Sequence, residues 1–258
     1  MVENYSVNLT GRTALITGAS AGLGARFARI LAASGANVVL AARRVALLEQ
    51  LTQDICDAGG QAIAVPMDVT DEASTKAAYD AAEAAFGVVD TVIGNAGLNI
   101  EGLTFDLDAS ALDAINQVNV KGLFLTLREG ARRLIDAGSS ERQHGRMVAI
   151  SSITAQYIAG GTGAYSASKA AALQLCRVLA REWANRGINL NIVLPGYIPT
   201  DINAEWFEKE GGQRQIQKWP RRRLMDESSL DGIILYLCSD ASQFVTGSMF
   251  TIDDGQSL

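Results

Sequence analysis

A tyrosine and a lysine stand four residues apart at Tyr165 and Lys169, in the run Tyr-Ser-Ala-Ser-Lys. On a helix this spacing places both side chains on one face, one turn apart. A free phenol has a pKa of about 10 and is a poor acid–base catalyst at neutral pH. A nearby ammonium stabilises the phenolate and lowers that pKa. We therefore expect Tyr165 to accept a proton from an alcohol or to donate one to a ketone.

Two more polar residues lie where they could assist this phenol. Ser152 follows the apolar run 145–151, and its hydroxyl would hydrogen-bond the reacting oxygen. Ser151 is the weaker choice, because neighbours on a strand point to opposite faces. Asn119 lies within the helical stretch 115–127, where an asparagine is mildly unfavourable, so its amide is expected to hold a water that relays protons. Asn119, Ser152, Tyr165 and Lys169 are the candidate catalytic residues.

A glycine-rich loop, Gly-Ala-Ser-Ala-Gly-Leu-Gly, follows the first apolar run and opens the first helical stretch. Gly18 permits a tight turn, Gly22 lets the backbone approach a pyrophosphate, and Gly24 allows close helix–strand packing. The N–H groups at the start of the helix would face the phosphates. We expect a dinucleotide here, bound by Gly18, Ser20, Gly22, Leu23 and Gly24, whose positive nicotinamide ring would acidify the phenol further.

The end of the second apolar run indicates which dinucleotide is bound. An acidic residue there would bind the 2′-hydroxyl of NAD, but the chain has Ala42 followed by Arg43. Arg43 would pair with a 2′-phosphate and stack on the adenine. NADP(H) is therefore favoured, while NAD(H) stays open, because Arg43 could also be a solvated charge.

Two other strand ends are candidates for contacts with the adenosine part. Asp68 and Val69 end the third apolar run, where a carboxylate would accept a hydrogen bond from the adenine amino group. Asn95, Ala96 and Gly97 end the fourth, where small residues let the backbone approach the ribose. Aspartate and the run Asn-Ala-Gly also occur commonly in turns.

Short apolar runs alternate with longer amphipathic stretches along the whole chain. The runs are continuous rather than alternating, which is typical of parallel strands covered on both faces. The pattern predicts one α/β domain over 1–258, a doubly wound, seven-stranded parallel sheet with helices on both faces, the Rossmann fold. Strands are expected at 13–17, 37–42, 62–66, 89–94, 145–151, 190–194 and 249–252, and helices at 22–34, 45–58, 71–86, 109–137 (one or two) and 165–185.

One long polar excursion interrupts this rhythm at 201–229. In an open α/β sheet ligands bind outside the carboxyl ends of the strands, so the excursion is a candidate substrate lid or else an ordinary pair of surface helices. Thr154, Tyr157, Trp206 and Phe207 are candidates to line a pocket for an apolar or aromatic substrate. The alternative for each is plain packing.

Composition excludes several other functions. A net charge of −6 gives no reason to expect nucleic acid or an anionic membrane as a partner, and no apolar run is long enough to span a bilayer. His144 is the only histidine, which excludes multi-histidine metal sites, and no metal is expected. The three cysteines show no metal or disulfide spacing, and no signal peptide is apparent. We expect a cytoplasmic protein that acts on a small molecule.

With these motifs the chain resembles the short-chain dehydrogenase/reductase family, in its single-domain branch of about 250 residues. The loop from Thr17 resembles the family's TGxxxGxG. Residues 95–97 resemble its NNAG, although Gly94 replaces the first asparagine. The resemblance implies that Tyr165 is the acid/base and that Lys169 also holds the nicotinamide ribose.

The same resemblance extends to the C-terminal third. The run 195–200 resembles PGxxxT, so Pro195, Gly196, Ile198 and Thr200 are implied to bind the carboxamide end of the cofactor. The ending from Ile252 resembles vDGG, with an aspartate in place of one glycine. Family members are mostly tetramers, so a homo-oligomer is implied.

Three functions remain open at this point. The first is an NAD(P)-dependent secondary-alcohol dehydrogenase or ketone reductase. The second is a 3-oxoacyl-carrier-protein reductase, which needs a basic patch for its acidic partner, for instance Arg128, Arg132 and Arg133. The third is a non-catalytic dinucleotide sensor or scaffold, which has no need of an acid/base such as Tyr165.

Overall fold

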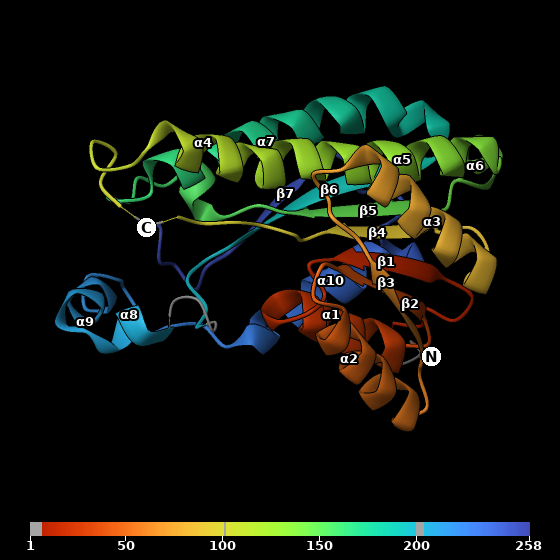
Figure 1. Cartoon of the computed structure of the whole chain (residues 1–258), viewed down its shortest axis with the longest axis horizontal. Helices are drawn as coiled ribbons and strands as arrows, with labels where there is room; N and C mark the ends of the chain where they lie inside the picture. The colour runs from red at the N-terminus through yellow and green to blue at the C-terminus, as the bar shows by residue number, and fades with distance from the viewer. Residues whose placement is uncertain (1–6, 101, 200–203) are drawn as a thin grey trace, which may run out of the picture.

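The computed structural model, which describes residues 7–100, 102–199 and 204–258, has one parallel sheet between two layers of helices (Figure 1). The strands run in the order β3-β2-β1-β4-β5-β6-β7, so the order reverses between β1 and β4. Every neighbouring pair is parallel. The strands are β1 (Thr13–Thr17), β2 (Asn37–Ala42), β3 (Gln61–Pro66), β4 (Thr91–Gly94), β5 (Gly145–Ile150), β6 (Ile188–Pro195) and β7 (Met249–Ile252). This is the doubly wound Rossmann fold expected from the sequence.

Helices cover both faces of the sheet (Figure 1). One layer holds α1, α2 and α10, and the other holds α3, α4, α5 and α7. The helices are α1 (Gly22–Ala33), α2 (Val45–Asp57), α3 (Glu72–Phe86), α4 (Ala109–Asn116), α5 (Leu123–Asp136), α6 (Ser139–Arg142), α7 (Gly163–Trp183), α8 (Ala204–Glu208), α9 (Glu210–Ile216) and α10 (Asp231–Cys238).

A hydrophobic core lies on each face of the sheet, and these two cores explain the continuous apolar runs of the sequence. Along β1, Ala14 and Ile16 pack into the core under α1 and α2, while Leu15 packs into the core under α3, α5 and α7. Because successive side chains of a strand point to opposite faces, a strand covered on both sides must be apolar at every position. The same alternation repeats along β2, where Val38 and Leu40 enter the first core and Val39 the second.

Of the two alternatives left open for 109–137, the structure has two helices, joined by a π-helical turn at Gln117–Gly122. The segment of α10 had no helix assigned, because Gly-Ile-Ile-Leu-Tyr-Leu-Cys is apolar all round and lacks the periodicity of an amphipathic helix. Burial against the first core explains its composition.

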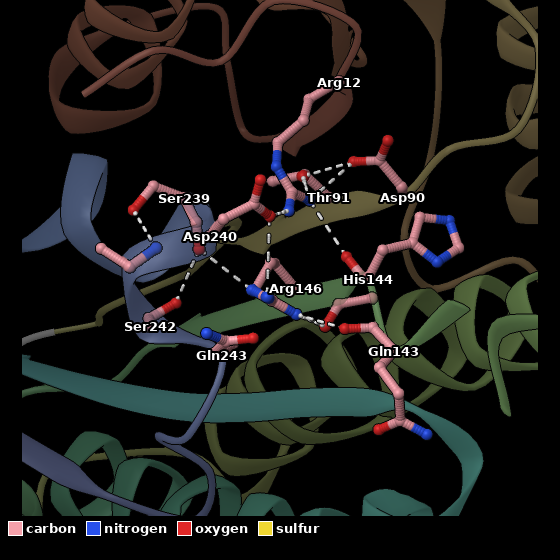
Figure 2. A network of polar contacts seen from close by, with 12 residues as sticks. Arg12, Asp90, Thr91, Gln143, His144, Arg146, Ser239, Asp240, Ser242 and Gln243 are labelled. Atoms are coloured by element: carbon pink, nitrogen blue, oxygen red, sulfur yellow. Dashed lines mark hydrogen bonds and ion pairs between the residues drawn. The ribbon is translucent and has the colours of Figure 1, made fainter. Parts of the chain in front are cut away.

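A buried polar network holds the amino-terminal ends of the strands together (Figure 2). The guanidinium of Arg12, before β1, donates to the carboxylate of Asp90, before β4, at 3.3 Å, and also to the carboxylate of Asp240. Arg146, in β5, donates to the carbonyl oxygen of Ser239 at 3.0 Å. These contacts tie the turn after α10 to the sheet, at the end opposite to the strand ends that carry the site residues.

In the described parts of the chain, no helix combines the length and the apolar character needed to cross a membrane.

Candidate active site

A cavity of about 930 Å³ lies at the carboxyl ends of the strands. Its wall is built by residues that follow β1, β2, β3, β4, β5 and β6, together with α8 and α9. This is the place where open α/β sheets bind ligands, beside the reversal of strand order. The volume is at the upper end of the range for ligand pockets, about 300–1,000 Å³, so a dinucleotide and a small substrate can share it.

Most of the site residues named from the sequence line this single cavity. They are Gly18, Ser20, Gly22, Leu23, Arg43, Asp68, Val69, Asn95, Ala96, Gly97, Ser152, Thr154, Tyr165, Lys169, Pro195, Gly196, Ile198, Trp206 and Phe207. They come from every part of the chain between β1 and α8, and the sheet brings them to one edge.

Three named residues of the described chain do not line it. Gly24 packs α1 against the loop, since a Cβ there would lie 2.3 Å from the carbonyl oxygen of Gly18. Asn119 is buried behind the wall. Tyr157 was expected in the pocket, but the chain turns back after Ser152, and the backbone N–H of Tyr157 donates to a carbonyl at 2.7 Å within that turn. Thr200 lies outside the described residues.

The glycine loop has the shape that a pyrophosphate needs. Gly18 and Gly22 have φ angles of 67° and 51°, in the left-handed region that favours glycine. A Cβ on Gly18 would lie 3.0 Å from the backbone of Ala96, whereas a Cβ on Gly22 would meet nothing within 4 Å. The loop is thus packed on one side and open on the other, with the amino end of α1 beside the opening, which fits an anionic dinucleotide.

The end of β4 is fixed to the end of β1 by three hydrogen bonds. The backbone N–H groups of Asn95 and Ala96 donate to Thr17 Oγ1, each at 3.0 Å. The side-chain amide of Asn95 donates to the carbonyl oxygen of Thr17, also at 3.0 Å. Asn95 therefore holds the cavity wall in shape, a role that the sequence motif alone did not reveal.

The candidate acid/base stands in the first turn of α7. Tyr165 lies half-buried in the cavity wall, and the ammonium of Lys169 lies 5.6 Å from the centre of its ring. Lys169 itself is buried and donates to the carbonyl oxygen of Ile150 at 3.0 Å. Ser152 also lines the cavity, at the end of β5, and its hydroxyl accepts from the hydroxyl of Thr154 at 3.0 Å.

The electrostatics differ from the sequence expectation in one respect. In the protein alone, burial raises the pKa of Tyr165 to about 12, and only a hydrogen bond with Ser152 opposes this rise. Burial also lowers the pKa of Lys169 to about 8. Desolvation of the phenolate is therefore the largest effect on this pKa in the protein alone.

Asn119 lies at the π-helical turn and all its polar atoms are engaged. Its Oδ1 accepts from the N–H of Leu98 at 2.7 Å, and its Nδ2 donates to the carbonyl of Leu98 and to Ser168 Oγ, each at 2.9 Å. Ser168 in turn donates to the carbonyl oxygen of Tyr165 at 2.7 Å. This side chain connects the loop after β4 to the first turn of α7. It leaves no side-chain donor of Asn119 for a water, in contrast to the relay expected of its amide.

Two arginines, rather than one, lie at the end of β2. Arg43 lines the cavity, and its charge helps to lower the pKa of the Asp68 carboxyl, after the larger effect of two hydrogen bonds from Thr70. Arg44 also lines it, and its guanidinium donates twice to Ser20 Oγ in the glycine loop, at 3.1 and 2.9 Å. Sequence reasoning missed Arg44, although it stands directly beside Arg43.

The sequence also missed several residues around the mouth of the cavity. Leu98, Asn99 and Leu103 follow the motif at the end of β4, and Tyr197 lies inside the run 195–200. Their position next to recognised motifs was the available signal. Other residues of the wall that had not been singled out are Ala21, Ala41, Met67, Gly102, Val118, Ile150, Gly160, Gly161, Thr162 and Gln215.

The chain is similar to known proteins over almost its full length. The family model described as short chain dehydrogenase matches residues 12–211. The oxidoreductase UcpA of Salmonella typhimurium is 34% identical over 97% of this chain and 96% of its own. The 3-oxoacyl-[acyl-carrier-protein] reductase FabG of Escherichia coli is 31% identical over 98% of this chain and 100% of its own.

A solved structure agrees with these sequence relatives. An Agrobacterium tumefaciens protein, provisionally called a 2-deoxy-D-gluconate 3-dehydrogenase and solved with bound NADP, superposes with a TM-score of 0.87. It is 32% identical, over 97% of this chain and 98% of that one. The fold, the match to the family model and the full-length relatives lead to one conclusion: the chain belongs to the short-chain dehydrogenase family of oxidoreductases.

Proposed function

We propose that the protein is an NAD(P)-dependent oxidoreductase that interconverts a secondary alcohol and a ketone, with Tyr165 as the general acid/base. The observation that carries this proposal is that Tyr165 and Ser152 share one cavity with the glycine loop at the ends of the strands. A phosphate-binding loop alone would suit a sensor, whereas a phenol and a hydroxyl facing the same space suit proton transfer to a substrate oxygen.

A dinucleotide, when bound, would supply or accept the hydride, and its oxidised ring would add a positive charge to the site. The residues of the chain provide the rest. The glycine loop and the amino end of α1 hold the pyrophosphate, while Pro195, Gly196 and Ile198 hold the nicotinamide end. Lys169 holds the ribose next to that ring.

Ser152 and Tyr165 together orient the substrate oxygen. The hydroxyl of Ser152 hydrogen-bonds that oxygen from the β5 side, and the phenol of Tyr165 exchanges the proton with it from the α7 side. Tyr165 is the third residue of α7, so the partial positive charge of the helix amino terminus favours its phenolate. This contribution and Lys169 both act in the direction that lowers the pKa.

For the cofactor we propose NADP(H) in preference to NAD(H). Two guanidinium groups, those of Arg43 and Arg44, line the part of the cavity at the end of β2, where Ala42 provides no carboxylate for a 2′-hydroxyl. A 2′-phosphate bound there would pair with both guanidinium groups. The NADP-bound relative is consistent with this preference.

The carrier-protein reductase stays as a second candidate because of the full-length similarity to FabG. The expected basic patch does not favour it. Arg133 forms ion pairs with Asp80, Glu83 and Glu129, each within 2.8 Å. Arg128 pairs with Glu72 at 2.7 Å. These arginines are largely neutralised by their own neighbours, so they attract an acidic partner weakly.

We also propose three features of the working enzyme. The segment 201–229 acts as a lid, since Trp206, Phe207 and Gln215 in α8 and α9 line the cavity. The protein works as a homotetramer in the cytoplasm, as the family resemblance implies. Its three cysteines are unpaired, which suits a reducing compartment.

Replacing Tyr165 by phenylalanine tests the function directly. Loss of the hydroxyl should lower turnover of ketones at least about a hundredfold, because proton transfer is lost, while the dinucleotide still binds. Turnover is followed by nicotinamide absorbance and binding by fluorescence titration. The matched control is Tyr236→Phe in α10, away from the cavity wall, which should behave as the wild type. Full turnover in Tyr165→Phe would remove the phenol from the mechanism.

A further inference from the structure

The cavity is unevenly charged along its length. Among the described residues that line it, the cationic side chains are Arg43, Arg44 and Lys169. The two arginines follow β2, which is separated from β5 by β1 and β4 in the sheet. Neighbouring strands lie about 4.8 Å apart, so these charges are on the order of 14 Å from the end of β5 and from Ser152. They belong to the adenosine end.

Lys169 does not offer its charge to a substrate group in the outer part of the cavity. Its side chain is 95% buried, and its ammonium donates to the carbonyl oxygen of Ile150 in the floor. The amino end of α7 adds a partial positive charge, but it begins at Gly163, two residues before Tyr165, where negative charge already develops. The ammonium of Lys169 and the amino end of α7 therefore both lie near the phenol of Tyr165 rather than in the outer part of the cavity.

The outer part of the cavity is apolar and aromatic. Leu98, Leu103, Tyr197, Trp206 and Phe207 line it. The rings of Trp206 and Phe207 are in edge contact, with centroids 4.8 Å apart. Phe207 also packs edge-on against Tyr197, at 5.7 Å.

A second layer holds this wall in place. Tyr197 stacks on the buried ring of Trp219, at 5.2 Å and an interplanar angle of 24°. An aromatic wall braced from behind is suited to a flat or apolar group of the substrate.

Among the described residues from 204 to 229, no cationic side chain lines the cavity. Arg214 on α9 pairs with Glu210, and Arg221 and Arg223 pair with Asp254. Lys209, Lys218 and Arg222 are not part of the wall either. The internal residues outside the described part are Glu101 and the run Thr-Asp-Ile-Asn at 200–203. None of these five residues has a cationic side chain.

We propose that the substrate is an uncharged ketone or secondary alcohol that carries a flat apolar group next to the carbinol carbon, and that carboxylates are selected against. A carboxylate in this part of the cavity would lose water without gaining a cationic partner, which is costly in an apolar site. The flat group contacts Trp206 and Phe207 while the carbonyl oxygen faces Ser152 and Tyr165. This proposal rests on the proposed function and adds the class of substrate.

Matched pairs of substrates test the proposal. A panel of aryl ketones is assayed in which each member exists as a carboxylate and as its methyl ester, for example 4-acetylbenzoate and methyl 4-acetylbenzoate, together with gluconate as an anionic alcohol. The wild type should convert the esters with a kcat/KM at least about tenfold above that of the acids, since one uncompensated charge is worth at least this much in a partly desolvated site. Equal or higher kcat/KM for the acids, or for gluconate, would overturn the proposal.

A positive charge placed in the wall should reduce the preference for the esters. Gln215 lines the cavity, so Gln215→Lys should raise the ratio of kcat/KM for the acids to that for the esters about fivefold. Gln217→Lys adds the same charge two residues further along, outside the cavity wall, and should leave this ratio unchanged. If both variants act alike, the outer cavity does not determine the selection by charge, and the proposal fails.

Trp206 tests the apolar part of the claim. Trp206→Ala should lower kcat/KM for aryl ketones about tenfold more than for small aliphatic ketones, and Trp206→Phe should recover most of the loss. An equal loss on both kinds of ketone would contradict the contact with a flat group. These outcomes are separable from failure of the proposed function, in which no carbonyl compound of either charge is converted with NADP(H) or NAD(H).

Discussion

Replacing Lys169 by methionine should make the folded protein more stable while removing its activity. The lysine is buried, and burial lowers the pKa of its ammonium from 10.5 to about 8. The unfolded chain therefore binds this proton more tightly than the folded chain does. At pH 7, below both values, the folded state carries the full cost of the buried charge, roughly 3 kcal/mol.

The variant removes this cost and adds a smaller one. Methionine fills a similar volume without a charge, but the hydrogen bond from Lys169 to Ile150 is lost, at about 1 kcal/mol. The free energy of unfolding at pH 7 should thus rise by roughly 2 kcal/mol. In the wild type this free energy should increase with pH between about 8 and 10.5, where only the unfolded chain holds the proton. The variant should lack this increase, so its advantage disappears by pH 10.

Urea unfolding of both proteins at pH 7 and pH 10, followed by fluorescence, measures this difference. The buried thiol of Cys176, the nearest other titrating group, has its pKa raised by burial to about 12 and does not interfere. Lys218→Met, at an exposed lysine outside the cavity wall, is the control and should change stability little at either pH. A Lys169→Met variant destabilised equally at both pH values would refute the reasoning, because the ammonium would then carry no burial cost.

Three further predictions follow from contacts in the structure. Ser168→Ala removes the hydroxyl that joins Asn119 to the Tyr165 carbonyl, so kcat should fall about tenfold while the affinity for the dinucleotide stays unchanged. Steady-state kinetics and fluorescence titration measure these two quantities, and an equal loss of affinity would contradict a positioning role. Arg43→Ala and Arg44→Ala should each lower the ratio of kcat/KM with NADP(H) to that with NAD(H) about tenfold, and an unchanged ratio in both would remove the 2′-phosphate argument. Arg12→Met leaves the buried carboxylate of Asp90 without its ion pair, so the free energy of unfolding measured in urea should fall by about 3–5 kcal/mol. Arg29→Met breaks an exposed ion pair and should lower it by less than about 1 kcal/mol. Similar losses in the two variants would mean that the network of Figure 2 contributes little to stability.

Much of the fold could be predicted from the sequence because the signal is local. A strand covered on both faces must be apolar at every position, so a run such as that from Asn37 to Ala42 can be recognised as a strand from the sequence. The bounds of β1 and β2 agree with the expected ranges for this reason. By contrast, α10 is apolar without amphipathic periodicity, because it packs into the core rather than beside it.

The residues of the candidate site also fall into those that a sequence motif predicts and those that it does not. Gly18, after β1, and Tyr165, in the first turn of α7, are found by motif and by position. Arg44, Leu103 and Gln215 reach the cavity through the path of their loops and short helices, which no local pattern specifies. The pKa of Tyr165 depends on burial as well as on charge, so the spacing of Tyr165 and Lys169 did not indicate that burial raises this pKa in the protein alone.

The central claim is that the phenol of Tyr165 becomes acidic only when burial is offset by Lys169, the amino end of α7 and the oxidised dinucleotide together. An ultraviolet titration of the phenolate, recorded as the difference between the wild type and Tyr165→Phe, measures this pKa with and without the oxidised cofactor. We predict a pKa of about 12 for the free protein and a clearly lower one for the complex. The same pKa in both states would contradict the account.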